Sequence, residues 1–359
     1  MSILTDFMER RLLDHIFGVT EMTKLTSLYL GISTTAFSES DTASQALAKE
    51  VGTSGTTYNG NGYSRVNVYN NFEDTTAGAT NGSQISFPQA TTSNWGSIGY
   101  WALFEDALPS NGTSSSTIDA DDGQKPLMVG SFSAAVTTNV GDQFRIASGD
   151  FDITQPSALN TRTNFSFDNG RVNLTNLMGL NGGNTTWTFW DGSNLNKRHY
   201  MGVSTSAFGS SGTNDENNAG AQEPGASTQG TTSNSLSSYN NNGYSYRPQI
   251  TFNSASTSSG TTTITNSNAV EFPECATNNW GDITHFAIFA GGDTDSNALT
   301  HQRYAKYPAG FNVSTGTSSG NAAVEQRRPF FIGALDATKT INVGDTLRFP
   351  AGSISIALD

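Results

Sequence analysis

The sequence predicts a mainly β protein: two tandem antiparallel β-sandwich domains, jelly-roll-like, with a short amphipathic helix at the N-terminus. Three observations predict it. Gly, Ser, Thr and Asn are abundant, only 14% of the residues are charged, and four blocks of sequence occur twice in the same order. Globular proteins average about 25% charged residues. So low a share disfavours long solvated helices and suits short strands joined by many turns.

Chain length predicts the domain organisation. A chain of 359 residues exceeds the usual span of one hydrophobic core, so two domains are expected. Aromatic residues make up 10% of the chain, which is enough to build real cores. The expected divisions are a helix and connector over 1–23, a first sandwich over 24–154, a linker over 155–195, and a second sandwich with loop insertions over 196–359.

The N-terminal segment has the periodicity of an amphipathic helix. Its apolar residues recur at helical spacing and form one stripe: Met8, Leu12, Leu13, Ile16 and Phe17. Thr5 or Asp6 can cap the helix, and Gly18 can end it. Two roles remain open for this stripe. It can lie on the first β domain, or it can be a docking helix for a neighbouring subunit.

From Leu25 onward the pattern changes to short apolar runs separated by Gly-Asn, Asn-Gly and Gly-Asp turns, as expected for strands and hairpins. The predicted strands of the first copy are Leu25–Ser33, Arg65–Tyr69, Gln84–Phe87, Gly96–Phe104, Lys125–Phe132 and Asp142–Ile146.

Internal repetition is the strongest signal in the sequence. Phe87–Phe104 recurs as Phe272–Phe289, with nine of 18 positions identical. Three further blocks repeat in the same order, so the chain contains a duplicated unit. The distance between matched blocks grows from 171 to 203 residues, which places insertions in loops of the second copy. One insertion, Gly212–Asn242, is polar and is expected to be an exposed or poorly ordered loop.

The repeated block predicts a strand, a tight corner and the next strand. Its prolines are expected to end the first strand because they lack a ladder donor. Its glycines allow a positive φ at the corner. Its tryptophans are either core anchors or surface stacking platforms for a glycan or partner. The residues that define the motif are Phe87, Pro88, Trp95, Gly96, Phe272, Pro273, Trp280 and Gly281.

Charge and cysteine content exclude several classes of protein. The net charge of −13 argues against nucleic acid as a partner. No apolar stretch approaches the ~20 residues of a membrane span, and no secretory leader is expected at the N-terminus. The single cysteine, Cys275, forms no disulfide framework and fits a reducing cytosol. We expect it to be buried and unreactive.

Catalytic and metal-binding patterns are not found, so no catalytic, cofactor-binding or metal-ligating residue and no cofactor is predicted. His285 lies in the repeated block, but Tyr100 holds its place in the first copy, which favours a packed histidine over a general base. Asp142 and Asp345 could ligate calcium, although a turn contact with the backbone is the favoured interpretation.

The order of motifs resembles a family of virion structural proteins of tailed bacteriophages that includes head-decoration and tail-fibre-like proteins. The resemblance covers the N-terminal helix and 1–154, and it recurs from about 196 to 359. That family usually has one such unit, so the tandem arrangement departs from it, as do Tyr246 and Arg247 in place of a Ser-Arg-Val run. The motifs that carry it are Leu28–Thr34, Gly62–Val66, Phe87–Ile98 and Val140–Ile146.

The resemblance implies a non-enzymatic virion structural protein, made in the host bacterial cytoplasm. The first expectation is a capsid decoration or cement protein that binds the major capsid protein as a homo-oligomer. The alternative is a tail, baseplate or fibre component, bound to tail proteins, whose loops Gly212–Asn242 and Asp106–Gln124 contact host glycans. A second alternative is a carbohydrate-binding or carbohydrate-active protein. Neither a membrane nor a nucleic acid is expected as partner.

Overall fold

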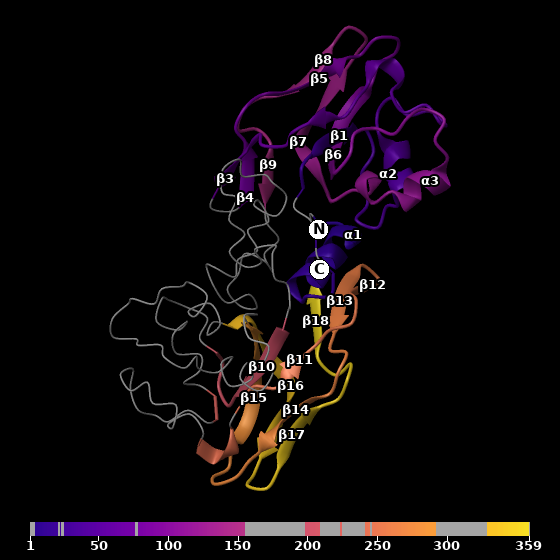
Figure 1. Cartoon of the computed structure of the whole chain (residues 1–359). Helices are drawn as coiled ribbons and strands as arrows, with labels where there is room; N and C mark the ends of the chain where they lie inside the picture. The colour runs from indigo at the N-terminus through magenta and orange to yellow at the C-terminus, as the bar shows by residue number, and fades with distance from the viewer. Residues whose placement is uncertain are drawn as a thin grey trace.

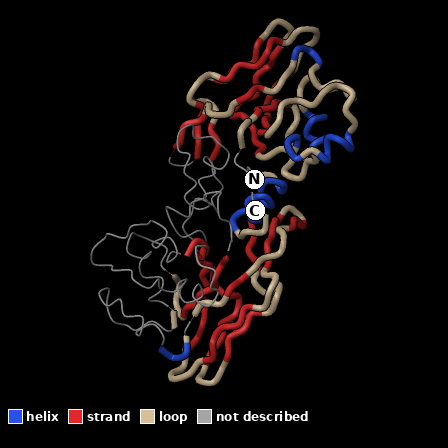
Figure 2. The backbone as a smooth tube through the Cα atoms, in the orientation of Figure 1, coloured by secondary structure: helices blue, strands red, loops and turns tan. Residues whose placement is uncertain are grey.

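A computed structural model of the chain describes residues 4–20, 22, 25–75, 78–154, 198–208, 223–224, 241–244, 246–291 and 329–358. It confirms the predicted fold class: antiparallel sheets arranged in two halves, with an N-terminal helix (Figure 2). We call residues 25–154 the first half and residues 198–358 the second half. The predicted linker 155–195 lies outside the described residues, so the proposed domain boundaries remain a prediction.

The first half contains three antiparallel sheets. The central one has the strand order β2 (Val66–Asn67), β1 (Tyr29–Ser33), β6 (Gly96–Phe104) and β7 (Met128–Thr138). A second sheet joins β3 (Phe72–Thr75), β4 (Gly78–Asn81) and β9 (Asp152–Thr154). A third pairs β5 (Ile85–Gln89) with β8 (Gln143–Ile146).

The second half has the same sheet order. Its four-stranded sheet is β11 (Gln249–Ile250), β10 (Arg198–Ser204), β15 (Gly281–Gly291) and β16 (Pro329–Ile341). Its smaller sheets are β12 (Ser256–Ser258), β13 (Thr261–Thr265) and β18 (Ser355–Leu358), and β14 (Val270–Glu274) with β17 (Thr346–Phe349). The irregularities match as well. The register of β6 against β7 shifts between Ile98 and Tyr100, and that of β15 against β16 shifts between Ile283 and His285.

The predicted role of the two prolines as strand ends is wrong. β5 continues through Pro88 to Gln89, and β14 continues through Pro273 to Glu274. Each proline lies where the register against the partner strand shifts, and each of these strands pairs on one side only. The missing N–H therefore removes no regular ladder bond, which is where proline is tolerated in a sheet.

Helix α1 (Asp6–Ile16) begins where the sequence predicted. The N–H of Met8 donates to the hydroxyl of Thr5 at 3.3 Å, and Gly18 follows the helix with φ 73°. Figure 1 shows α1 between the two halves. One hydrophobic cluster includes the α1 stripe and buried residues of both halves, so the helix belongs to the core of the molecule.

Two short helices were not predicted from the sequence. α2 (Ala43–Lys49) has a capping box in which the side chains of Thr42 and Gln45 bond to each other's backbone N–H. α3 (Ser115–Ala120) packs beside it and begins at Ser114. The remaining described helical turns are η1 (Gly60–Gly62), η2 (Asp122–Gln124) and η5 (Asn241–Gly243).

Candidate functional site

The tryptophans of the repeated block occupy matching positions in the core. The indole N–H of Trp95 donates to the carbonyl of Asn61 at 3.0 Å, and that of Trp280 donates to the carbonyl of Asn242 at 2.8 Å. Both asparagines have left-handed backbones, with φ 58° and 62°. The two indoles are 5% and 4% exposed, so neither presents a face on which a glycan could stack.

A tyrosine completes the aromatic packing of each corner. Tyr63 lies edge-on to Trp95 at 5.7 Å, and Tyr244 lies edge-on to Trp280 at 5.2 Å. Phe87 stacks on Tyr63, and Phe272 stacks on Tyr244, with ring centroids 6.3 and 5.9 Å apart. Both phenylalanines are almost fully buried. Aromatic pairs in these arrangements add to the free energy of simple burial.

The hydroxyl of each of these tyrosines leads to a buried ion pair. In the first half, Tyr63 donates to Glu50 at 2.5 Å, and Arg65 pairs with the same carboxylate at 2.6 Å. Both charged side chains are 0% exposed. Arg65 also lies over the ring of Phe104, 3.5 Å from its centroid. Burial and the neighbouring carboxylate raise the pKa of Tyr63 well above its ordinary value.

The second half builds the same cluster, but its ion pair uses two residues, Glu223 and Arg247, that the sequence comparison did not match. Tyr244 donates to Glu223 at 2.6 Å, and Arg247 pairs with that carboxylate through two hydrogen bonds of 2.9 and 2.8 Å. Arg247 lies 3.3 Å above the ring centroid of Phe289. The pKa of Tyr244 is raised for the same reasons, burial first.

Two features of the sequence hid this cluster. Arg247 is three residues beyond Tyr244 whereas Arg65 is two beyond Tyr63, so a rigid alignment reads it as a departure. Glu223 lies within the tract 212–242, which the sequence predicted to be an exposed or poorly ordered loop. Of that tract the structure describes only residues 223–224 and 241–242. The side chain of Glu223 is buried, with 2% of its residue surface exposed.

A glycine in each half makes room for the cluster. A β-carbon on Gly31 would lie 2.8 Å from both Glu50 and the ring of Phe104. One on Gly202 would clash with Glu223 and with Phe289. Gly31 and Gly202 begin one of the repeated blocks, Gly31–Phe37 and Gly202–Phe208. The buried carboxylate explains why both copies have glycine at this position.

The N-terminal end of α1 is fixed to the first half. The N–H of Thr5 donates to the carbonyl of Leu127 at 3.2 Å, and its hydroxyl donates to the carbonyl of Pro126 at 2.6 Å. Leu4 forms a β-bridge with Met128. Farther along the helix, Arg11 pairs with Glu105 at 2.9 Å.

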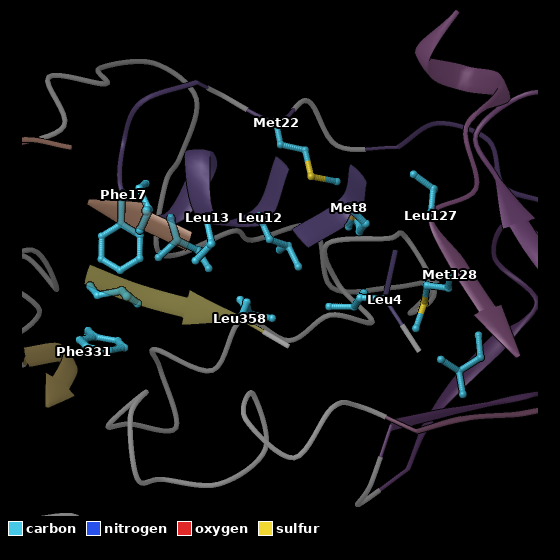
Figure 3. Close-up of a cluster of buried hydrophobic side chains, with 14 of the residues drawn as sticks. Leu4, Met8, Leu12, Leu13, Phe17, Met22, Leu127, Met128, Phe331 and Leu358 are labelled. Carbon is cyan, nitrogen blue, oxygen red and sulfur yellow. The ribbon is translucent and has the colours of Figure 1, made fainter. Parts of the chain in front are cut away.

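The C-terminal end of α1 contacts the second half (Figure 3). The ring of Phe17 lies 4.6 Å from that of Phe252 and 6.1 Å from that of Phe331. Asp14 accepts a hydrogen bond of 2.6 Å from the N–H of Ala255. The imidazole Nε2 of His199 lies 3.2 Å from the carbonyl oxygen of Ile16. Helix α1 therefore bridges the two halves.

This bridge changes the interpretation of the predicted stripe. The five stripe residues are 0–3% exposed, and both halves contribute to their burial. The helix does not lie on the first half alone, as one interpretation expected. The stripe is covered within the described part of the chain, and docking of this helix to a neighbouring subunit stays a prediction.

The other polar candidates serve as turn contacts. Asp142 accepts from the N–H of Asn139 at 2.9 Å, and Asp345 accepts from that of Asn342 at 2.8 Å. His285 is partly buried beside Thr284, with the ring nitrogen 2.8 Å from the hydroxyl. Among the described residues there is no group of three or more His, Cys, Asp or Glu side chains that could hold a metal.

The geometry defines a class of protein: a duplicated β scaffold in which each half holds a buried tryptophan corner and a buried ion pair, with one helix joining the halves. A family model for the podophage GP4 fiber I protein gp80 matches residues 3–154 and 220–312. The chain belongs to this family. The second matched segment includes Glu223, Tyr244 and Trp280.

The match bears on the three functions expected from the sequence. It supports the alternative of a tail, baseplate or fibre component and gives no support to a capsid decoration protein. No match was found among the curated proteins. Within the described residues, no helix is long and apolar enough to cross a membrane.

Proposed function

We propose that this chain is a structural, non-enzymatic component of a phage tail fibre, associated with other tail proteins of the virion. The observation that carries the proposal is the match of the fibre family to 3–154 and 220–312. The architecture supports it: the two repeated tryptophans, Trp95 and Trp280, are buried and hydrogen-bonded inside the chain. They build a rigid scaffold rather than an open reactive centre.

Immunogold labelling of purified particles tests this proposal, combined with a count of copies per particle on a gel. A fibre component gives label on the tail and a small number of copies. Label spread over the capsid, with hundreds of copies, would overturn the fibre assignment in favour of head decoration. Release of reducing ends from host polysaccharide by the purified protein would contradict the non-enzymatic part.

A second, narrower proposal concerns the loop 106–124, which sequence analysis named as a glycan contact. Residues 110–112 and 114–117 are exposed and consist of Ser, Asn, Gly and Thr. The loop is held in place by Asp119, whose carboxylate accepts from the N–H and hydroxyl of Ser44 at 2.8 and 2.9 Å. A fixed array of hydroxyl and amide groups suits hydrogen bonding to sugar hydroxyls. Binding of the chain to a glycan array, lost when 114–117 are replaced by Ala, would support this contact, and unchanged binding would refute it.

A further inference from the structure

Strand β7 forms one edge of the four-stranded sheet in the first half (Figure 1). Apart from the bridge of Leu4 to Met128 at its start, no strand in the described part of the chain pairs with its outer side. Residues 133–137 of this strand are all exposed, on both faces of the sheet. We call residues 133–137 the β7 edge. A free strand edge presents a row of peptide N–H and C=O groups with which another extended chain can pair.

The β7 edge also presents apolar surface. Val136 is 50% exposed, and Val140 in the turn after the strand is 48% exposed. Val136 pairs with Ile98 of β6, so its side chain lies on the same face of the sheet as this fully buried residue. The apolar face of the sheet therefore continues to the rim of the first half, where half of the Val136 surface remains open to solvent.

The matching edge of the second half, in β16, carries charges. Residues 336–340 of β16 are exposed in the same way, and the strand pairings equate them with residues 133–137. Three charged residues of the second half stand where the first half has neutral ones: Asp336 for Ser133, Lys339 for Val136, and Asp282 on the neighbouring strand for Ser97. Charged side chains on a strand edge oppose pairing with a further strand. The second half is therefore protected at the place where the first half is not.

The charge of the chain indicates what can cover the β7 edge. No charged residue lies between Lys125 and Asp142, whereas the chain as a whole has a net charge of −13. Two copies of so acidic a chain repel each other. A neutral or basic segment of a different polypeptide meets no such repulsion, so the charge favours it over a second copy.

We propose that the β7 edge is a strand-addition site, at which an extended, neutral or basic segment of another tail protein joins the sheet of the first half. This proposal rests on the proposed fibre function and names the kind of partner. Main-chain hydrogen bonds hold such a segment, and its alternate side chains give specificity. An aliphatic side chain of the segment covers Val136, which removes apolar surface from water.

Competition for incorporation into particles tests the site. The full-length Val136→Lys variant and the wild-type chain, with different tags, are produced together during infection, and their ratio in purified particles is measured on a gel. The variant transfers the charge of Lys339 to the first half. We expect about a tenfold deficit of the variant, the scale set by losing one buried aliphatic contact. The matched control is Val343→Lys, because Val343 is also 50% exposed but lies in the second half.

Photo-cross-linking in purified particles identifies the occupant. Benzoylphenylalanine is placed at position 136 and, as control, at position 339 of the full chain. Strand addition gives a cross-link from position 136, and none from position 339, to a neutral or basic peptide of another tail protein. A cross-link to a second copy of this chain, or no cross-link from position 136, overturns the proposal.

The competition has two outcomes that overturn the site. One is incorporation of Val136→Lys at the wild-type level, and the other is an equal deficit for Val343→Lys, which would reveal a general effect of added charge. Urea unfolding checks that Val136→Lys folds as the wild type does, and if it does not, the cross-link from position 136 decides. Particle labelling separates the two proposals. Tail label with full incorporation of Val136→Lys refutes strand addition alone, whereas capsid label refutes the fibre function.

Discussion

Asp14 accepts a 2.6 Å hydrogen bond from the backbone N–H of Ala255, 241 residues further along the chain. This bond joins the last turn of α1 to the start of the β12–β13 hairpin region in the second half. The ring contacts of Phe17 with Phe252 and Phe331 also join residues far apart in the sequence. The contacts of Asp14 and Phe17 with the second half can therefore be changed one side chain at a time.

Replacing Phe17 by Ala should loosen the second half from α1. The ring is 2% exposed and contacts Phe252 and Phe331, and removal of a buried Phe side chain costs about 3–5 kcal/mol. We expect faster hydrogen exchange in β10 and β13, with β6 unchanged. The control is Phe7→Ala, because the Phe7 ring lies under Arg11 and Lys125 instead. Equal exchange in both variants would show that Phe17 has no special role in the bridge.

Replacing Asp14 by Asn should preserve the bridge and reduce its pH dependence. Burial raises the pKa of the Asp14 carboxyl, although the Ala255 N–H and Arg10 oppose the shift. Because the pKa of Asp14 is raised in the folded chain, this group's contribution to the free energy of unfolding is complete below the ordinary aspartate pKa of about 3.9. That contribution is lost as the pH rises through the pKa of Asp14 in the folded chain. Asn has no charge and keeps an acceptor for the Ala255 N–H. Denaturant midpoints at pH 4 and 7 should therefore differ less in this variant, whereas Asp14→Ala should lower the midpoint. A variant with Asn that is as unstable as the one with Ala would contradict this.

Substituting Ala for Gly281 or Gly96 should destabilise each corner by a similar amount. Both glycines have left-handed backbones, with φ 83° and 86°, which cost other residues about 1–2 kcal/mol. Space is adequate at Gly281, where the nearest atom to a new β-carbon is 3.7 Å away, and tighter at Gly96, at 3.4 Å. Gly99→Ala is the control, since its backbone is ordinary and its nearest neighbour is 3.5 Å away. Urea unfolding that ranks Gly99→Ala with the other two would contradict the backbone argument.

Stability should fall at alkaline pH through Tyr63 and Tyr244. Burial, with the adjacent glutamates, raises the pKa of both hydroxyls well above 10.0. The unfolded chain loses these protons near the ordinary value of about 10, while the folded chain retains them. The contribution of these two hydroxyls to the free energy of unfolding is therefore complete below that pH. It is lost as the pH rises through the pKa values of the tyrosines in the folded chain. A chain with Tyr63→Phe and Tyr244→Phe should be less stable at pH 8, yet lose less between pH 9 and 11. Parallel unfolding curves for the two proteins would refute this.

The thiol of Cys275 should react slowly in the folded chain. It is 0% exposed, and burial raises its pKa. Ala90 holds the matching position in the first half and is also buried, so Cys275→Ala should cost no more than about 1 kcal/mol, the scale of a small buried-volume change. A thiol reagent in native buffer measures the first point and urea unfolding the second. Fast labelling of the folded chain would contradict the first.

Periodicity and repetition were enough to predict the β class and the duplicated tryptophan corner. Trp95 and Trp280 lie in blocks whose local sequence is retained, so comparing the two copies aligns them directly. The α1 stripe was equally visible. The residues that cover the stripe could not be predicted, because a stripe shows that one face of a helix is buried without showing what covers it.

The buried clusters were missed for a different reason. Glu50 follows a short helix and Glu223 lies in a polar tract, so neither has a local signal, and only the tertiary contact with Tyr63 or Tyr244 identifies them. Helix α2 did have a signal in Thr42 and Gln45, the capping box that begins it. It was overlooked because seven residues are too few to show a clear apolar period.

The ion pairs of Arg65 with Glu50 and of Arg247 with Glu223 are sealed from water. Dissolved ions weaken contacts between exposed charges but reach enclosed ones poorly. The two halves should therefore keep their shape at both low and high salt concentration. This is a useful tolerance for a particle that persists between hosts.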